Sequence, residues 1–412
     1  MWKKIGKAAF VGLILVFCAG WFFPSSATGL EGKAGEVIRS ENDIKELETK
    51  GLIPRSQAAS FSELVKAGVS IPIVETTDRT IALSKGYKTA TEMYKGTVTL
   101  NPEGAMQNYK SGRPFPDVRP DDPKAGIKAA WNWDCKHHPA DFWQEFKYWL
   151  TDAKGNTKIL GGRGEQGWGR LYFGRRTDMD PKPDLIPGNP EGVWYKEITS
   201  MSEPFALKGL AQLTVKYIDP SRDNDIWIYV PGLRRTIRIG GGNKCDCLGG
   251  FVHNVDDGQI FDGNILSNTY KMLGVQDYLA FALTNPEVPV TKNEKVHLTN
   301  FKLERRKVWL VEATVKDPHY CYSKRLWRID PENFWILHAE NYDRAGRMWK
   351  EHSLIFANHP SGDGGISMEN RGGNVVDHKI WESGSWTIPK FVPNSGLPQS
   401  IFTLDYLRRV GR

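Results

Sequence analysis

The chain has 412 residues, of which 55 are Lys or Arg and 48 are Asp or Glu, so its formal net charge is +7. A charge this small for this length does not indicate a nucleic-acid-binding protein, and no nucleic-acid partner is expected. The sequence is rich in aromatic residues, with 15 Trp, 14 Tyr and 18 Phe. Such residues suit a large β core or the wall of an apolar cavity.

The first 27 residues predict an export signal. Lysines precede an apolar run over residues 8–23, and Ser25 and Ala27 supply the small residues of a cleavage site. We expect cleavage after Ala27 and a location in the periplasm. Cys18 raises the alternative of a lipid anchor, but Phe17 stands where lipoprotein processing favours a small residue. An uncut membrane anchor is the third alternative.

After residue 27 the chain contains four cysteines, namely Cys135, Cys245, Cys247 and Cys321. An even number in an exported protein predicts two disulfides. Cys245 and Cys247 are too close in sequence to bond to each other without strain, so each is expected to pair with Cys135 or Cys321. A metal site that adds His137 and His138 is the alternative, but the spacing matches no common zinc pattern. We expect neither metal nor cofactor.

Residues 28–125 are expected to form a helical and irregular N-terminal segment. Ser40 is a good N-cap for a helix that ends near Gly51. Further short helices are predicted over residues 60–66 and 87–95. After a connector rich in Gly and Pro, Asp122 and Pro123 begin a helix that runs to Trp131.

Strand patterns recur from residue 142 onward, at the spacing of antiparallel hairpins. The predicted strands cover residues 145–150, 158–160, 167–173, 194–199, 207–218, 226–230, 234–239, 308–314, 322–329, 335–342 and 348–357. They predict a mainly β (α+β) protein with one large curved antiparallel sheet or an open barrel over residues 126–412. Residues 264–273 and 275–283 are predicted to be short helices, and residues 362–412 show no clear pattern.

The hairpin at residues 226–239 is the clearest element. Its first strand places Trp227 and Tyr229 on one face and isoleucine and valine side chains on the other. Large aromatics cover a concave wall with few rotamers, whereas β-branched side chains suit tight packing, so we predict that Trp227 and Tyr229 line a cavity. The same argument nominates three residues on later strands, Trp309, Trp327 and Trp335.

The order of the motifs resembles a bacterial family of unknown function that is related to the outer-membrane lipoprotein-sorting proteins (the LolA, LolB and RseB group). The matching segments are residues 126–132, 226–235, 261–263, 270–274, 324–330 and 342–350. The resemblance covers nearly the whole chain after residue 27. It implies an incomplete β-barrel with helices across its open side and an apolar cavity. The segments around Cys135 and Cys245 depart from the family pattern.

The resemblance implies a non-enzymatic periplasmic carrier or chaperone for a lipid, a lipoprotein acyl chain or another hydrophobic molecule bound for the outer membrane. A resistance-nodulation-division-type transporter and an outer-membrane β-barrel are the partners that it implies. Basic pairs are predicted to hold an acidic headgroup or a partner, although each pair taken alone also fits a solvated strand face. They are Arg234 with Arg235, Arg305 with Arg306, and Lys324 with Arg325.

Two other classes of function are alternatives to a carrier. An envelope sensor or interaction module would need the same cavity. A metal-dependent or carbohydrate-active enzyme would draw on the polar residues near Trp131 and Trp133, but no nucleophile elbow or zinc-protease motif accompanies them. These polar residues are Asp134, His137, His138, Asp141 and Glu145.

Overall fold

The computed structural model describes residues 29–80, 83–239, 244–247, 251–283 and 301–411. The predicted export signal and its cleavage site lie outside these residues. The α-helices of the described chain are α1 (Glu41–Thr49), α2 (Arg55–Lys66), α3 (Lys85–Tyr94), α4 (Ala125–Asp134) and α5 (Leu404–Val410). Within the described ranges, no helix is both long enough and apolar enough to cross a membrane.

Strands make up most of the regular structure. In chain order they are β1 (Val37–Ile38), β2 (Ile71–Val74), β3 (Thr99–Leu100), β4 (Met106–Gln107), β5 (Asp141–Thr151), β6 (Thr157–Gly162), β7 (Trp168–Tyr172), β8 (Val193–Ser200), β9 (Ala211–Tyr217), β10 (Asp225–Val230), β11 (Arg235–Ile239), β12 (Asn268–Phe281), β13 (Leu303–Val315), β14 (Tyr322–Ile329), β15 (Ile336–Asp343), β16 (Met348–Pro360), β17 (Ile366–Asp377) and β18 (Glu382–Pro393).

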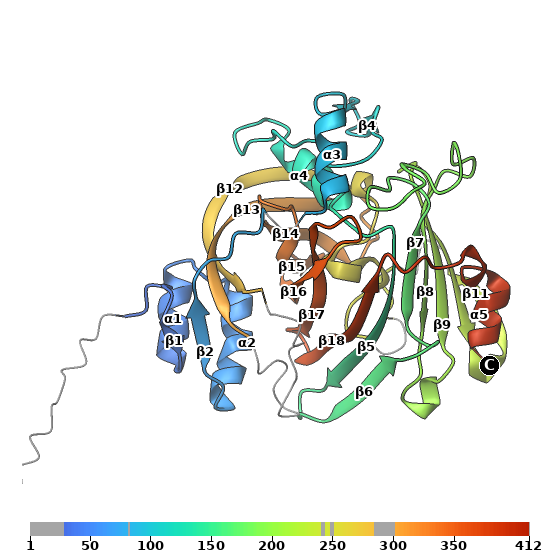
Figure 1. Ribbon diagram of the computed structural model, residues 1–412. Coiled ribbons are helices and arrows are strands. Elements are labelled where there is room, and N and C mark those ends of the chain that lie inside the picture. Colours follow the sequence, from blue (N-terminus) through green and yellow to red (C-terminus); the bar gives the residue numbers. More distant parts are fainter. Residues whose placement is uncertain (1–28, 81–82, 240–243, 248–250, 284–300, 412) are drawn as a thin grey trace, which may run out of the picture.

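Sixteen of these strands form one curved sheet that does not close (Figure 1). Its order is β1-β2-β13-β14-β15-β16-β17-β18-β5-β7-β8-β9-β10-β11, and β12 and β6 add to β13 and β5. Neighbouring strands are antiparallel except β2 and β13, which are parallel. The predicted class, a mainly β protein with a large open sheet, is confirmed.

Helix α4 lies against one face of the sheet and fills the space over β12 to β16 (Figure 1). Its Trp131 and Trp133 are buried in the same core as Trp309 and Trp327 of the sheet. A side chain larger than hydrogen at Gly126 would meet the backbone of Tyr270 in β12, so α4 approaches the sheet closely there. This half of the concave face is therefore solid core.

The opposite face of the sheet is covered by other helices. Helices α1 and α2 pack Leu47, Phe61 and their neighbours against Leu279 and Ile355, and α5 covers β9 and β10 (Figure 1). Helix α1 begins as predicted, because Ser40 and Asp43 cap each other's backbone N–H groups.

Residues 264–273 and 275–283 were predicted to be short helices, but most of them form the long strand β12, and only Ile265–Ser267 form a 3-10 helix. The residues of β12 pair with β13 from Asn268 opposite Val315 to Phe281 opposite Leu303, with a shift of register between Met272 and Gly274. That irregularity interrupts the two-residue alternation, so the apolar residues imitate a helical spacing. Residues 362–412, which showed no clear pattern, supply β17, β18 and α5.

Candidate functional site

The half of the concave face that α4 leaves uncovered forms a cavity of about 560 Å³. Its wall comes from β5, β7, β8, β9, β10, β11 and β16 to β18, and its roof from residues 251–262. A volume of this size is typical of pockets for small ligands.

One end of the cavity is apolar. Ile226, Ile228 and Val230 of β10 face it side by side with Ile237 and Ile239 of the edge strand β11. The apolar lining also includes Phe146, Met201, Leu210 and Trp386. Period-2 alternation along β10 explains why all three aliphatic side chains share this face.

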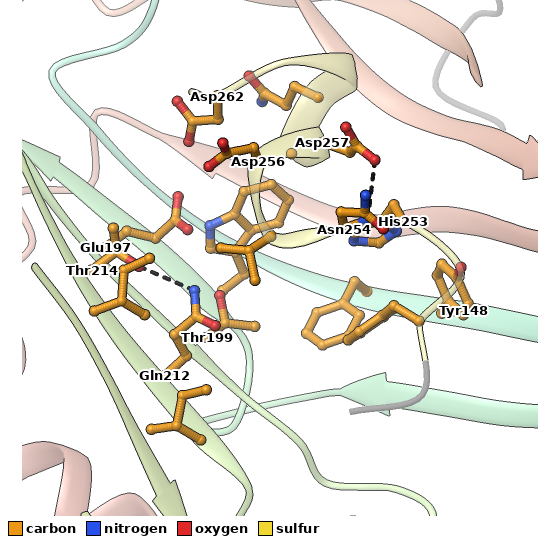
Figure 2. A pocket seen from close by; sticks show the side chains of 18 of the residues that line it. Tyr148, Glu197, Thr199, Gln212, Thr214, His253, Asn254, Asp256, Asp257 and Asp262 are labelled. Atoms are coloured by element: carbon orange, nitrogen blue, oxygen red, sulfur yellow. Dashed lines mark hydrogen bonds between the residues drawn. The ribbon is translucent and has the colours of Figure 1, made fainter. Parts of the chain in front are cut away.

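The roof end is polar (Figure 2). Asp256, Asp257 and Asp262 descend from the roof, and Glu197 of β8 rises toward them from the wall. Arg170 of β7 pairs with Glu197 at 2.5 Å. Burial alone would raise the pKa of Asp262, but nearby Lys216 and Arg170 outweigh it and lower the pKa to about 2. The Asp262 carboxylate is therefore ionised at pH 7 and is paired with these two cations.

Two histidines of the cavity are neutral at pH 7. Burial lowers the pKa of His253 to about 4 and that of His352 to about 3, although Asp257 opposes both shifts. They offer hydrogen-bonding nitrogen atoms without charge.

The prediction that Trp227 and Tyr229 line the cavity is wrong, because the opposite face of β10 does so. Tyr229 is 5% exposed and packs in the cluster that contains Phe402 and Leu407. Trp227 is partly buried against the same cluster. Helix α5 supplies a broad apolar surface on that side, and the aromatics fill it.

The later tryptophans also lie outside the cavity wall. Trp309, Trp327 and Trp335 are buried in the core between α4 and the sheet. The rings of Trp335 and Trp133 lie 5.4 Å apart, and those of Trp327 and Phe261 lie 5.2 Å apart. The physical reason is that α4 and the roof fill this half of the concave face, so the aromatic side chains there form core rather than a ligand surface.

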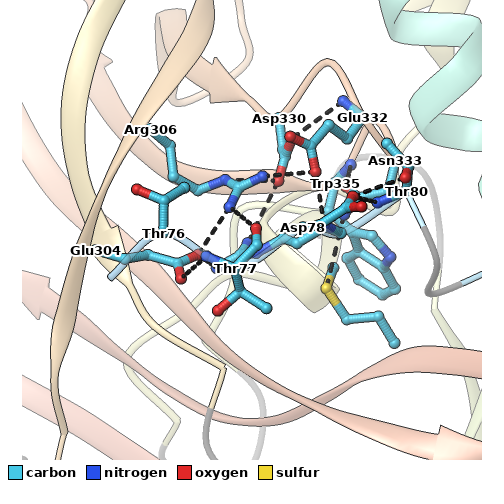
Figure 3. A network of polar contacts seen from close by, with 12 residues as sticks. Thr76, Thr77, Asp78, Thr80, Glu304, Arg306, Asp330, Glu332, Asn333 and Trp335 are labelled. Atoms are coloured by element: carbon cyan, nitrogen blue, oxygen red, sulfur yellow. Dashed lines mark hydrogen bonds and ion pairs between the residues drawn. The ribbon is translucent and has the colours of Figure 1, made fainter. Parts of the chain in front are cut away.

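The basic pairs separate into interior and surface residues. Arg306 is buried and forms ion pairs with Glu304, Asp330 and Glu332 at 2.8 to 3.1 Å (Figure 3). Arg325 is buried against Asp257 at 3.3 Å. These two positions support the fold, so they are not available to a headgroup.

The remaining basic residues are accessible to different degrees. Arg305 pairs with Asp277 at 2.7 Å, and Lys324 pairs with Glu312 at 2.7 Å. Arg234 and Arg235 are exposed where the β10–β11 hairpin turns, and Arg234 adopts a left-handed conformation with φ of 49°. Headgroup or partner docking stays a prediction for Arg234, Arg235, Arg305 and Lys324.

One predicted disulfide is present and the other is absent. Cys245 bonds to Cys321, while Cys135 is a buried free thiol and Cys247 an exposed one. Burial raises the pKa of Cys135 to about 11. The prediction of two disulfides is wrong because α4 and its C-cap hold Cys135 inside the core. In the described part of the chain, His, Cys, Asp and Glu form no group of three that fits a metal ion.

The residues considered for an enzyme are dispersed, and none lines the cavity. His138 stacks on Tyr172, and Asp134 pairs with Lys216 and Arg175. Asp141 accepts backbone hydrogen bonds from Ser395 and Gly396, and Glu145 accepts one from Gly164.

His137 has a more notable setting, because its two ring nitrogens contact Asp178 and the Ser367 hydroxyl, each at 3.1 Å. All three residues are buried, and Ser367 donates to Glu369. The group connects the loop after α4 to β17 and acts as a packed polar contact.

Sequence reasoning missed the polar residues of the roof end, Glu197, Arg170, Asp256 and Asp257. The motif at residues 261–263 was noted, but nothing local showed that Asp262 reaches back to a distant strand. One signal was available for Arg170, which is the single charged residue in the otherwise apolar strand β7.

Two solved structures illustrate the likeness in fold. A domain from Vibrio parahaemolyticus assigned to outer-membrane lipoprotein sorting is 17% identical, with a TM-score of 0.51, and the match covers 69% of this chain and 99% of that one. A DUF1329 family protein from Desulfovibrio piger is 16% identical, with a TM-score of 0.51 and coverage of 69% and 98%. Identities this low show the fold alone.

A LolA superfamily protein from Nitrosomonas europaea is 17% identical and covers 68% of this chain and 98% of its own, at a TM-score of 0.41. No curated protein matches the chain. The family model described as "Protein of unknown function (DUF1329)" matches residues 47–386, which is most of the sequence. The chain therefore belongs to the DUF1329 family.

Proposed function

We propose that this protein is a non-enzymatic carrier or chaperone that holds a lipid, a lipoprotein acyl chain or another hydrophobic molecule in its cavity. The observation that carries the proposal is the cavity of about 560 Å³, whose wall presents the aliphatic face of β10 and β11. The fold likeness to a domain assigned to lipoprotein sorting supports the same conclusion. The proposed setting is the periplasm, with the outer membrane as destination.

An apolar wall suits such a ligand on energetic grounds. Each methylene group that leaves water gains about 0.8 kcal/mol, so a chain of several carbons binds without specific polar contacts. Branched aliphatic side chains at Ile226, Ile228 and Ile237 form a smooth wall that accepts chains of different shape. A resistance-nodulation-division-type transporter and an outer-membrane β-barrel are proposed as partners in exchange of the ligand.

Two substitutions on one strand test the proposal, with a fluorescent fatty-acyl probe as ligand. Ile228→Phe places a larger side chain in the cavity, so we expect several-fold weaker binding and a protein that is still folded. Trp227→Ala alters the opposite face, so we expect unchanged binding and a loss of unfolding free energy of roughly 2–4 kcal/mol. Probe titration and urea unfolding measure the two effects.

The reverse pattern of effects would show that the ligand binds elsewhere. A folded wild-type protein that binds no apolar probe would refute the carrier function. Mass spectrometry of molecules extracted from protein purified from the periplasm then identifies the natural ligand, and a lower amount of it in protein with Ile228→Phe is the matched control.

A further inference from the structure

The roof end of the cavity holds four carboxylates, and three of them have a cation of their own. Glu197 pairs with Arg170 at 2.5 Å, Asp262 with Lys216 at 2.9 Å, and Asp257 with Arg325 at 3.3 Å. These pairs come from the strands and from the segment that forms the roof. They leave Asp256 as the fourth carboxylate.

Asp256 has no such cation. Among the described residues, no Lys, Arg or His nitrogen lies within 4 Å of its carboxylate, and its hydrogen bond comes from the Tyr320 hydroxyl at 3.3 Å. Burial raises the pKa of Asp256, the Asp257 and Asp262 carboxylates add to the effect, and Lys244 and Arg325 oppose it. The cavity therefore contains a carboxylate that forms no ion pair with a described side chain.

A second group at the same end has a nitrogen atom without a hydrogen bond. His352 of β16 is 1% exposed and lines the cavity, and its Nε2 makes no hydrogen bond in the described structure. The Asp257 carboxylate is 3.7 Å from this nitrogen, beyond hydrogen-bond reach. A neutral imidazole nitrogen accepts an N–H donor in one tautomer.

We infer that the ligand is an amphiphile whose polar group is an ammonium, with the ammonium at Asp256 and the apolar chain along Ile226 and Ile228. The inference rests on the proposed function, because it specifies the ligand of the same cavity. An ammonium group supplies the positive charge that Asp256 lacks and N–H donors for its carboxylate and for His352.

A ligand with an anionic group is disfavoured at this position. A carboxylate or phosphate beside Asp256 would meet like charge in a buried site, where such repulsion is strong. Asp257 and Asp262 lie on the same roof, and Arg170, the one cation that lines the described cavity, is already held by Glu197 and Asp262.

Three amphiphiles with a twelve-carbon chain, counting the carboxylate carbon of dodecanoate, test the inference on the full-length mature protein, each below its critical micelle concentration. Isothermal titration calorimetry compares dodecylammonium, dodecanoate and the neutral dodecyl maltoside. We expect dodecylammonium to bind about ten-fold more tightly than dodecanoate, the equivalent of one charge-assisted hydrogen bond. Lysophosphatidylethanolamine with a dodecanoyl chain shows whether the ammonium of a phospholipid is accepted as well as that of a simple amine.

Asp256→Asn removes the charge at nearly constant shape. We expect it to abolish most of the preference for dodecylammonium over dodecanoate, and binding of dodecyl maltoside by the variant reports an intact cavity. Asp405→Asn is the matched control, since Asp405 lies on α5 with a side chain 93% exposed; it should alter none of the affinities.

Equal or tighter binding of dodecanoate to the wild-type protein would overturn the inference, whether or not Asp256→Asn folds. So would a preference for dodecylammonium that survives Asp256→Asn. In both cases binding of the neutral amphiphile leaves the proposed function standing. If none of the amphiphiles binds, the proposed function itself fails.

Discussion

Single buried charged residues in this protein connect segments that are far apart in the sequence, and the strand patterns alone do not predict these contacts. Asp178 is an example, since its carboxylate accepts hydrogen bonds from the Ser84 hydroxyl at 2.6 Å and the Thr177 hydroxyl at 3.0 Å, and His137 Nε2 lies 3.1 Å away. Ser84 is also the N-cap of α3. One buried carboxylate thus joins the start of α3 to the segment after α4.

Asp178→Asn should therefore lower the free energy of unfolding by roughly 3–5 kcal/mol, the usual cost of breaking a buried ion pair. Although burial alone would raise the pKa of Asp178, His137 and the hydroxyl donors lower it well below its usual range. Burial alone would likewise lower the pKa of His137, but Asp178 raises it. These two shifts predict that the effect of the substitution depends on pH.

The stabilisation from Asp178 is present above its unfolded pKa of about 4 and is lost as pH falls toward its folded value. That from protonated His137 is present below its unfolded pKa of about 6.5 and is lost as pH rises through its raised folded value. The difference between wild type and Asp178→Asn should thus be largest near pH 5. Urea unfolding at pH 3, 5 and 9 measures it, and a difference that is constant with pH would contradict the ion pair.

At the scale of elements, local sequence patterns predicted which helices and strands exist better than which face of a strand points into the cavity. The α1 cap and the β10–β11 hairpin depend on neighbouring residues, so the sequence was sufficient for them. Both faces of β10 are apolar, and the choice between them is made by α5, a helix far along the chain. No local signal carries that information, which is why the predicted ligand face was inverted.

The contact between α4 and β12 gives a prediction at this scale. A Cβ at Gly126 would lie 2.9 Å from the carbonyl carbon of Tyr270 and 3.0 Å from the amide nitrogen of Lys271, both backbone atoms that have little freedom to move. Gly126→Ala should destabilise the protein by roughly 1–3 kcal/mol, although alanine is the better helix former.

Gly232→Ala is the control for this contact, because a Cβ added at this exposed hairpin turn would have no described atom within 4 Å beyond its chain neighbours. We expect it to leave stability nearly unchanged. Urea unfolding of both variants decides the matter, and a stabilised Gly126→Ala protein would show that α4 packs less closely on β12.

At the scale of the whole molecule, the cavity exists because the concave face is filled unequally. Helix α4 occupies one half, and residues 251–262 roof the other. The disulfide Cys245–Cys321 joins the chain just before the roof to the residue before β14. Its two cysteines are 76 residues apart in the sequence, and it is the only disulfide in the described part of the chain. Tyr322 beside it donates to Asp257 of the roof at 2.8 Å.

Replacing both Cys245 and Cys321 by Ser should therefore lower stability and ligand affinity together. Removing the cross-link frees a long loop in the unfolded chain, an effect of about 4 kcal/mol, and it loosens the attachment that positions Asp256 and Asp257. Cys247→Ser is the control, since Cys247 is an exposed free thiol two residues away, and it should change unfolding by less than about 1 kcal/mol. Urea unfolding and acyl-probe titration measure both effects. A double variant that loses stability but binds the probe as tightly as wild type would show that non-covalent contacts alone hold the roof in place.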